Sequence, residues 1–191
     1  MGKEFELKYA ATAAQLEILK NRYPQLRPIA METTYYDNAA GDFSRLKWTF
    51  RRRMENGISV CTLKTPMAGL GRAEFEAECA DLLEAVPQLL LQGAPEELAA
   101  MVAGGIAPSC GARFTRLAAK LEMPGCTAEL ALDAGLLLGG GKELAFREVE
   151  VELKGGSEEA MVAFTESLAA ELGLKPEPRS KVARARSLMH G

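Results

Sequence analysis

Histidine is almost absent from this chain: the only one is His190, one residue from the end of the 191-residue sequence. Histidine-based acid–base catalysis is therefore excluded from the main body of the chain, and a zinc site is disfavoured. Cysteine is scarce as well, and Cys61, Cys79, Cys110 and Cys126 show no Cys-x-x-Cys spacing. The pattern predicts reduced, partly buried thiols, as in a cytoplasmic protein.

The sequence also lacks a long apolar run and a strong excess of charge. No segment approaches the length that spans a bilayer, and the N-terminal stretch does not resemble a signal peptide. The 23 basic and 26 acidic residues leave a net charge of −3, which gives no reason to expect a nucleic-acid partner. A hydrophobic content of 48% supports a true core, so we expect one folded domain over residues 1–191, as a monomer or a homodimer.

The first strand candidate has one charged face. In the period of a β-strand, Glu4, Glu6 and Lys8 share one side, and the residues between and after them, Phe5, Leu7 and Tyr9, share the other. Two neighbouring carboxylates repel each other and need a cation between them or water around them. Taken alone, this strand fits a half-buried position with a solvated polar face.

The same division into an apolar and a charged face recurs along the chain. It is found in the strand candidates 45–54, 58–65, 72–78, 112–123, 127–133 and 143–153, whereas 29–37 is a strand rich in Thr and Tyr. Asn56-Gly57 predicts a hairpin between two of these strands. Helices are expected over 12–23, in two short segments within 81–103, and over 157–172, where Ser157 is the N-cap.

The charges on these faces are grouped by sign, with carboxylates on some strands and arginines on others. A surface built only for solubility would mix the two signs. The apolar faces can be covered by the amphipathic helices, so a sheet closed into a barrel would point its charged faces inward. We therefore predict an α+β fold, a barrel with a charged interior and outer helices; the alternative is an open sheet whose charged face is solvated.

A charged interior is tolerable only when water, metal and a charged ligand fill it. Carboxylates bind hard divalent cations such as Mg²⁺ or Mn²⁺, and arginines and lysines bind phosphate oxygens. Phosphoryl transfer needs positioning and charge neutralisation, and requires no Ser, Cys or His nucleophile. The pattern therefore favours a small-molecule polyphosphate as the substrate.

An ordered series of short motifs resembles the CYTH superfamily, the triphosphate tunnel metalloenzymes. The series consists of Glu4-x-Glu6-x-Lys8, Thr34-Tyr35-Tyr36-Asp37, Phe50-Arg51-Arg52-Arg53 before Glu55-Asn56-Gly57, Thr62-Leu63-Lys64, Arg72 to Glu76, Arg116, Leu132-Asp133, Glu148-Val149-Glu150-Val151-Glu152, and Ser180-Lys181 with Arg184. It extends over nearly the whole chain. The resemblance implies an eight-stranded antiparallel tunnel, dependence on Mg²⁺ or Mn²⁺, and a triphosphate substrate.

The resemblance also implies a role for individual residues. Metal binding falls to Glu4, Glu6, Asp133, Glu148, Glu150 and Glu152. Phosphate binding falls to Lys8, Arg51, Arg53, Lys64, Arg116 and Lys181. Catalysis falls to Glu4, Glu6, Lys8 and Glu150, whereas Arg72, Glu74 and Glu76 are wall residues whose role is open.

Several activities occur within this family. The arrangement is most similar to bacterial inorganic triphosphatases, so the expected reaction is metal-dependent hydrolysis of inorganic tripolyphosphate. The alternatives are a class IV adenylyl cyclase, a thiamine triphosphatase, and a polyphosphate- or nucleotide-binding module without turnover.

Overall fold

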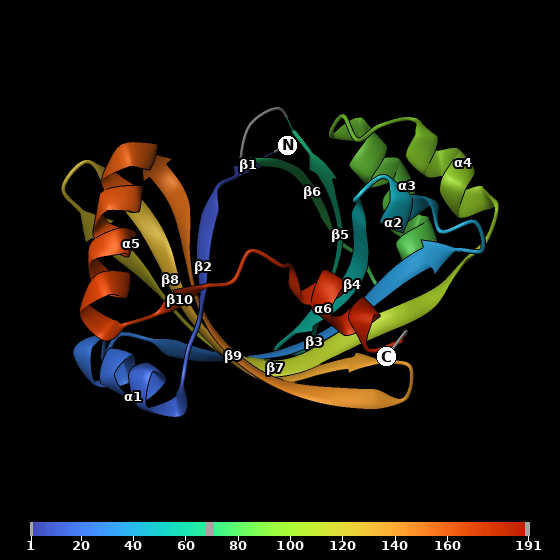
Figure 1. The fold of residues 1–191 in the computed structure, drawn as a ribbon. Coiled ribbons are helices and arrows are strands. Elements are labelled where there is room, and N and C mark those ends of the chain that lie inside the picture. The colour runs from blue at the N-terminus through green and yellow to red at the C-terminus, as the bar shows by residue number, and fades with distance from the viewer. Residues whose placement is uncertain (1, 68–70, 190–191) are drawn as a thin grey trace.

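The computed structural model describes residues 2–67 and 71–189, so His190 lies outside the described part of the chain. One antiparallel sheet dominates the fold (Figure 1). Its strands are β1 (Gly2–Glu4), β2 (Glu6–Ala10), β3 (Arg27–Asn38), β4 (Thr49–Glu55), β5 (Ile58–Pro66), β6 (Arg72–Glu78), β7 (Ile106–Met123), β8 (Cys126–Gly139), β9 (Lys142–Gly156) and β10 (Lys175–Pro176). The helices are α1 (Ala13–Arg22), α2 (Asp42–Arg45), α3 (Leu82–Leu91), α4 (Glu97–Ala103), α5 (Glu158–Leu172) and α6 (Lys181–Ser187).

The strand order is β1-β6-β5-β4-β3-β7-β8-β9-β2-β10. The predicted α+β class is confirmed, but the described residues form ten strands in place of the expected eight. The order begins at β1 and ends at β10, so no ladder within residues 2–67 and 71–189 joins these two ends. The closed barrel therefore stays a prediction.

Residues 2–10 lie at both ends of this order. β1 pairs with β6 and β2 pairs with β9, and only Phe5 separates β1 from β2. The carbonyl oxygen of Phe5 accepts a hydrogen bond from the Leu153 amide on β9, at 2.9 Å. The N-terminal run thus connects the β6 side of the sheet to the β9 side through one continuous stretch of backbone.

Local signals account for most of the element boundaries. Thr12 and Gln15 form a reciprocal capping box at the start of α1, and the Ser157 hydroxyl accepts from the Ala160 amide to begin α5. Asn56 and Gly57 both have positive φ values, 48° and 89°, as the tight β4–β5 hairpin requires. The predicted hairpin and these two predicted helices are confirmed.

Several stretches differ from the sequence prediction, and β7 and β8 extend well beyond the expected strands 112–123 and 127–133. The expected strand 45–54 begins only at Thr49, because residues 42–45 form α2 and Lys47 adopts a positive φ of 57°. At the C-terminal end, Ser180 caps a helix that was not predicted: its hydroxyl accepts from the Ala183 amide at 3.2 Å and opens α6. No helix of the described chain combines the length and apolarity needed to cross a membrane.

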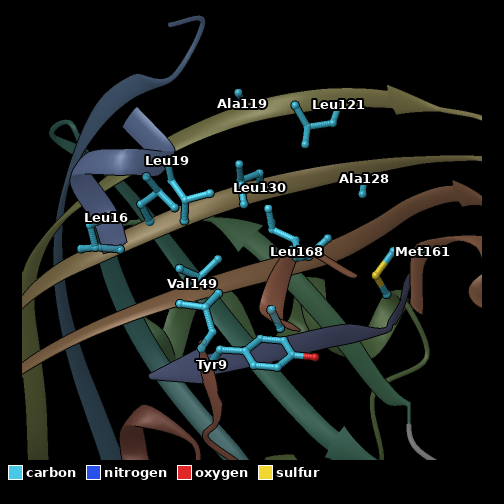
Figure 2. Close-up of a cluster of buried hydrophobic side chains, with 14 of the residues drawn as sticks. Tyr9, Leu16, Leu19, Ala119, Leu121, Ala128, Leu130, Val149, Met161 and Leu168 are labelled. Atoms are coloured by element: carbon cyan, nitrogen blue, oxygen red, sulfur yellow. The ribbon is translucent and has the colours of Figure 1, made fainter. Parts of the chain in front are cut away.

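The apolar faces of the sheet are covered by helices, as predicted. α1 and α5 lie against one half of the sheet, and α2, α3 and α4 lie against the other (Figure 1). Each half of the sheet forms a buried apolar cluster with its helices. Figure 2 shows part of the cluster beneath α1 and α5, where Leu16 and Leu19 of α1 and Leu168 of α5 pack around Leu130 of β8. Burial of each of these side chains stabilises the folded protein by about 1.5–3 kcal/mol relative to leaving the side chain exposed.

The concave face is only partly charged, which is a difference from the expected fully charged interior. α6 lies across the opening of the curved sheet (Figure 1). Beneath it, Val182 and Ala185 join Met31, Phe114 and Phe146 in a third buried apolar cluster. α6 therefore covers one end of the concave face and leaves the charged remainder as the candidate site.

Candidate functional site

A cavity of about 230 Å³ opens on the concave face of the sheet. Eight carboxylates and eight cationic side chains line it, so the lining is balanced in charge and suits a cation and an anion bound together. The acidic residues are Glu4, Glu6, Glu55, Glu74, Glu76, Glu129, Glu150 and Glu152, and the basic ones are Lys8, Arg51, Arg53, Lys64, Arg72, Arg116, Lys154 and Lys181.

The structure brings most of the predicted site residues to this one cavity. Ten of the twelve line it: Glu4, Glu6, Lys8, Arg51, Arg53, Lys64, Arg116, Glu150, Glu152 and Lys181. The other two, Asp133 and Glu148, lie on the same face of the sheet but are fully buried beneath α6 and do not line the cavity. Arg72, Glu74 and Glu76 also line it, as wall residues.

Strand register explains this convergence. Lys8 of β2 lies opposite Glu150 of β9, and Lys64 of β5 lies opposite Glu74 of β6. Residues directly opposite in an antiparallel pair project from the same face, so each pair of strands contributes matched charges to the concavity. The curvature of the sheet then brings Glu4 of β1 into contact with the Lys64 ammonium, which also lies 2.9 Å from Glu74.

Several charged side chains in the cavity, among them Arg51, Lys8 and Glu6, have no close partner of opposite charge among the described residues. Arg51 is 7% exposed, yet its Nε has no hydrogen-bond partner, and its nearest carboxylate oxygens, on Glu74 and Glu76, are 3.8 and 3.9 Å from Nη2. Among the described side chains, no ion pair within 4.0 Å is formed by Lys8 or by Glu6. A buried guanidinium whose carboxylate partners are this distant is poorly compensated, so this arrangement favours a bound anion.

The pKa values of Glu6 and Glu150 are shifted in opposite directions. The pKa of Glu6 is raised from 4.5 to about 7, chiefly because the Glu150 carboxylate repels its charge, and then because of burial and the nearby Glu4. Burial also disfavours ionised Glu150, but Lys181, Arg116 and Lys8 outweigh it and hold the Glu150 pKa well below its usual range. Lys64 and Lys8 therefore offset the repulsion at Glu6 only in part, whereas the cations around Glu150 outweigh its burial.

A second group of acids lies behind Glu150. Carboxylate oxygens of Asp133, Glu148 and Glu150 all lie within 4.8 Å of one another, a spacing that a metal ion could bridge. In this structure these acids contact basic side chains instead. Arg116 donates to both Asp133 oxygens at 2.8 Å and to Glu150, and Lys181 contacts all three acids.

Some charged residues of the site were not predicted. Glu55, Glu129 and Lys154 line the cavity, and Arg184 of α6 is buried in contact with Glu148. Glu55 follows the alternation of Arg51 and Arg53 and could have been found from that spacing. Lys154 is two residues beyond Glu152 and follows the same rule, whereas the position of Arg184 depends on how α6 packs.

The family comparison covers nearly the whole chain: a model of the CYTH domain matches residues 2–185.

Solved structures share the fold at low sequence identity. HpAC1 of Hippeastrum, a candidate adenylyl cyclase described with a dominant triphosphatase activity, is 19% identical and has a TM-score of 0.71, with 98% of this chain and 96% of that chain covered. A candidate adenylate cyclase of Bacillus halodurans is 18% identical with a TM-score of 0.65, covering 94% and 96%. PH1819 of Pyrococcus horikoshii is 22% identical with a TM-score of 0.64, covering 97% and 99%.

Proposed function

This chain belongs to the CYTH domain family, and on that premise we propose that it is a divalent-metal-dependent triphosphatase that hydrolyses inorganic tripolyphosphate. The reaction would use water to cleave one phosphoanhydride bond and release pyrophosphate and phosphate. We further propose that residues 1–191 act as one domain in the cytoplasm, and that residues 2–10 close the sheet into a tunnel around the site. The pairing of these residues with both β6 and β9 supports closure.

One observation carries the proposal: buried Arg51, whose Nε has no hydrogen-bond partner and whose nearest carboxylates are 3.8 and 3.9 Å away, lines the same cavity as Glu6, which forms no ion pair with a described side chain. An anion alone would satisfy Arg51 but would repel Glu6, and a cation alone would do the reverse. A metal–phosphate complex satisfies both at once. The balanced lining of the cavity supports the same ligand.

The acids of the cavity fit a hard divalent cation. Glu4, Glu6, Glu150 and Glu152 supply carboxylate oxygens, the ligands that Mg²⁺ and Mn²⁺ prefer. Glu6 forms no ion pair within 4.0 Å with a described side chain, and its raised pKa, chiefly due to repulsion by Glu150, supports a positive charge beside it. When bound, such an ion neutralises charge on the phosphate oxygens and polarises the phosphorus centre.

The basic residues fit the phosphate chain. We assign Lys8, Arg51 and Arg53 to the phosphate oxygens, because Lys8 and Arg51 are free to donate and Arg53 uses only Nε and one Nη in long contacts, to Thr33 at 3.2 Å and Glu55 at 3.4 Å. Lys64 and Arg116 line the same cavity and add positive charge, although each already contacts carboxylates. A carboxylate of the cavity would orient the attacking water.

The size of the cavity favours a substrate without a large organic group. At about 230 Å³ it is smaller than the roughly 300–1,000 Å³ of pockets that enclose drug-sized ligands. The described triphosphatase activity of the Hippeastrum protein supports hydrolysis, and the cyclase descriptions of both that protein and the Bacillus one make ATP cyclisation the second candidate.

The test is a panel of tripolyphosphate, ATP and thiamine triphosphate, each with Mg²⁺ or Mn²⁺, with every product identified. We expect phosphate and pyrophosphate from tripolyphosphate, and a loss of at least tenfold in the Glu6→Ala and Arg53→Ala variants. Cyclic AMP as the main product from ATP would assign a cyclase instead. Metal-dependent binding of tripolyphosphate without cleavage over hours would assign a binding module.

A further inference from the structure

The ammonium group of Lys181 sits among three carboxylates. Lys181 is the first residue of α6 and is 7% exposed. Its Nζ lies 2.8 Å from Asp133 Oδ2 and 2.8 Å from Glu150 Oε1, and it also contacts Glu148. We call Asp133, Glu148 and Glu150 the carboxylate cage.

Two aromatic rings fix the same ammonium from another side. Lys181 Nζ is 5.2 Å from the ring centre of Phe114 and 5.6 Å from that of Phe146. Distances of this kind give a favourable cation–π contact, and the contact is stronger when water is excluded. The Lys181 side chain is therefore built into the cage.

An ammonium group has three N–H donors, and the cage offers one carboxylate to each of them. No donor remains for a phosphate oxygen while the three contacts persist. The cage is also balanced in charge: its three carboxylates meet Lys181, Arg116 and Arg184. A divalent cation added to this buried group would leave excess positive charge away from bulk solvent, which is costly.

We propose that Lys181 is a resident cation that occupies a carboxylate cage of the kind that otherwise binds a divalent metal, and that it positions Glu150 and Asp133 for the site. Resting on the proposed function, the further consequence is that the divalent ion of the reaction binds on the Glu4, Glu6 and Glu152 side of the cavity. Lys181 would then act on carboxylates, in place of the phosphate-binding role that its sequence motif implies.

Lys181→Met is the central test, because methionine has nearly the same length and no charge. Emptying the cage should create a metal site, so the variant should bind about one more Mn²⁺ ion per chain than the unmodified protein. The count is made by electron paramagnetic resonance of free Mn²⁺ during titration at neutral pH. Lys120→Met is the matched control: Lys120 is an exposed lysine of β7 that contacts Glu122 at 2.7 Å and does not line the cavity, so its loss should add no ion.

Asp133→Asn tests whether the carboxylate cage holds the Lys181 ammonium or a divalent ion. In the unmodified background it should leave the number of bound Mn²⁺ ions unchanged, and in the Lys181→Met background it should remove the added ion. Lys181→Arg keeps the positive charge and should not gain an ion. A folded Lys181→Met protein that binds no additional Mn²⁺, or an Asp133→Asn protein that loses an ion from the otherwise unmodified chain, would overturn the proposal.

The Mn²⁺ count is independent of turnover. A protein that hydrolyses no triphosphate, but gains an ion in Lys181→Met, refutes the proposed function and supports the cage. If the unmodified protein hydrolyses tripolyphosphate normally but Asp133→Asn loses an ion, the proposed function is supported and the cage proposal is refuted. If circular dichroism shows that Lys181→Met does not fold, the number of Mn²⁺ ions bound by Asp133→Asn still tests the proposal, because loss of an ion in that variant would overturn it.

Discussion

Glu150 raises the pKa of Glu6 from the neighbouring strand. The two side chains project from β2 and β9 into the same cavity, and repulsion by Glu150 is the largest contribution to a Glu6 pKa of about 7. Glu150 itself stays ionised because Lys181 and Arg116 hold its charge. The site therefore holds one fixed carboxylate and one that titrates near neutrality.

This relationship predicts a pH dependence of stability in the absence of divalent metal. The folded pKa of Glu6 lies above its unfolded value, so its contribution is fully present below about pH 4.5 and is lost as the pH rises through about 7. Between pH 5 and pH 8, the free energy of unfolding should fall further in the unmodified protein than in Glu6→Gln, by on the order of 2 kcal/mol. Urea titrations with a chelator present measure the difference. Parallel pH profiles for the two proteins would contradict the prediction.

Arg51 and Arg52 form a matched pair for testing the anion site. They are neighbours on β4, but Arg51 lines the cavity and its Nε has no hydrogen-bond partner among the described residues, whereas Arg52 projects from the other face and donates to Ser59 at 3.1 Å. Arg51→Gln should lower kcat/KM for tripolyphosphate by roughly 10²–10³-fold, while Arg52→Gln should change it less than about threefold. Equal losses in the two variants would place the phosphate elsewhere.

Glu148 is expected to matter for stability because it is fully buried against Arg184 and Lys181. Glu148→Gln leaves the buried Arg184 with only the more distant carboxylate of Glu177, at 3.9 Å, and should lower the free energy of unfolding by about 3–5 kcal/mol. The double variant Glu148→Gln with Arg184→Met removes that poorly compensated charge and should recover part of the loss. Denaturant unfolding of both variants checks this, and a double variant less stable than the single one would argue against it.

Leu130 tests whether the outer core and the site are separable. It is fully buried between the sheet and the outer helices (Figure 2), on the face opposite the cavity. Leu130→Ala should lower the free energy of unfolding by about 2–5 kcal/mol. The folded protein should keep its KM for tripolyphosphate, because the cavity lining is untouched. Thermal unfolding and steady-state kinetics at a temperature below the transition measure the two effects.

The sequence predicts which side chains meet, because strand alternation alone assigns a face to each residue. Glu6, Arg53 and Glu150 are far apart in the chain and converge on one cavity, as their charged faces implied. Register adds the rest, since Lys8 and Glu150 become neighbours once β2 pairs with β9.

The pairing of those charges could not be predicted from the sequence. Asp133 and Glu148 are acidic residues on the same strand face as the acids of the cavity, so the sequence does not distinguish them. A short C-terminal helix nevertheless covers them and supplies Lys181 and Arg184. The path of that helix depends on Val182 and Ala185 packing against β7 and β8, which is a tertiary effect. A similar effect replaces the start of the expected strand 45–54 by α2 and its turn at Lys47.

The split N-terminal strand has a consequence for folding kinetics. Residues 6–10 pair with residues 148–152, and residues 2–4 pair with residues 72–74, so both partners are distant in sequence. Contacts that close such long loops form slowly, and a topology rich in them folds on the millisecond-to-second scale. The charged interior should therefore assemble late, after the local hairpins, so that its mutually repelling groups meet only when the surrounding scaffold already exists.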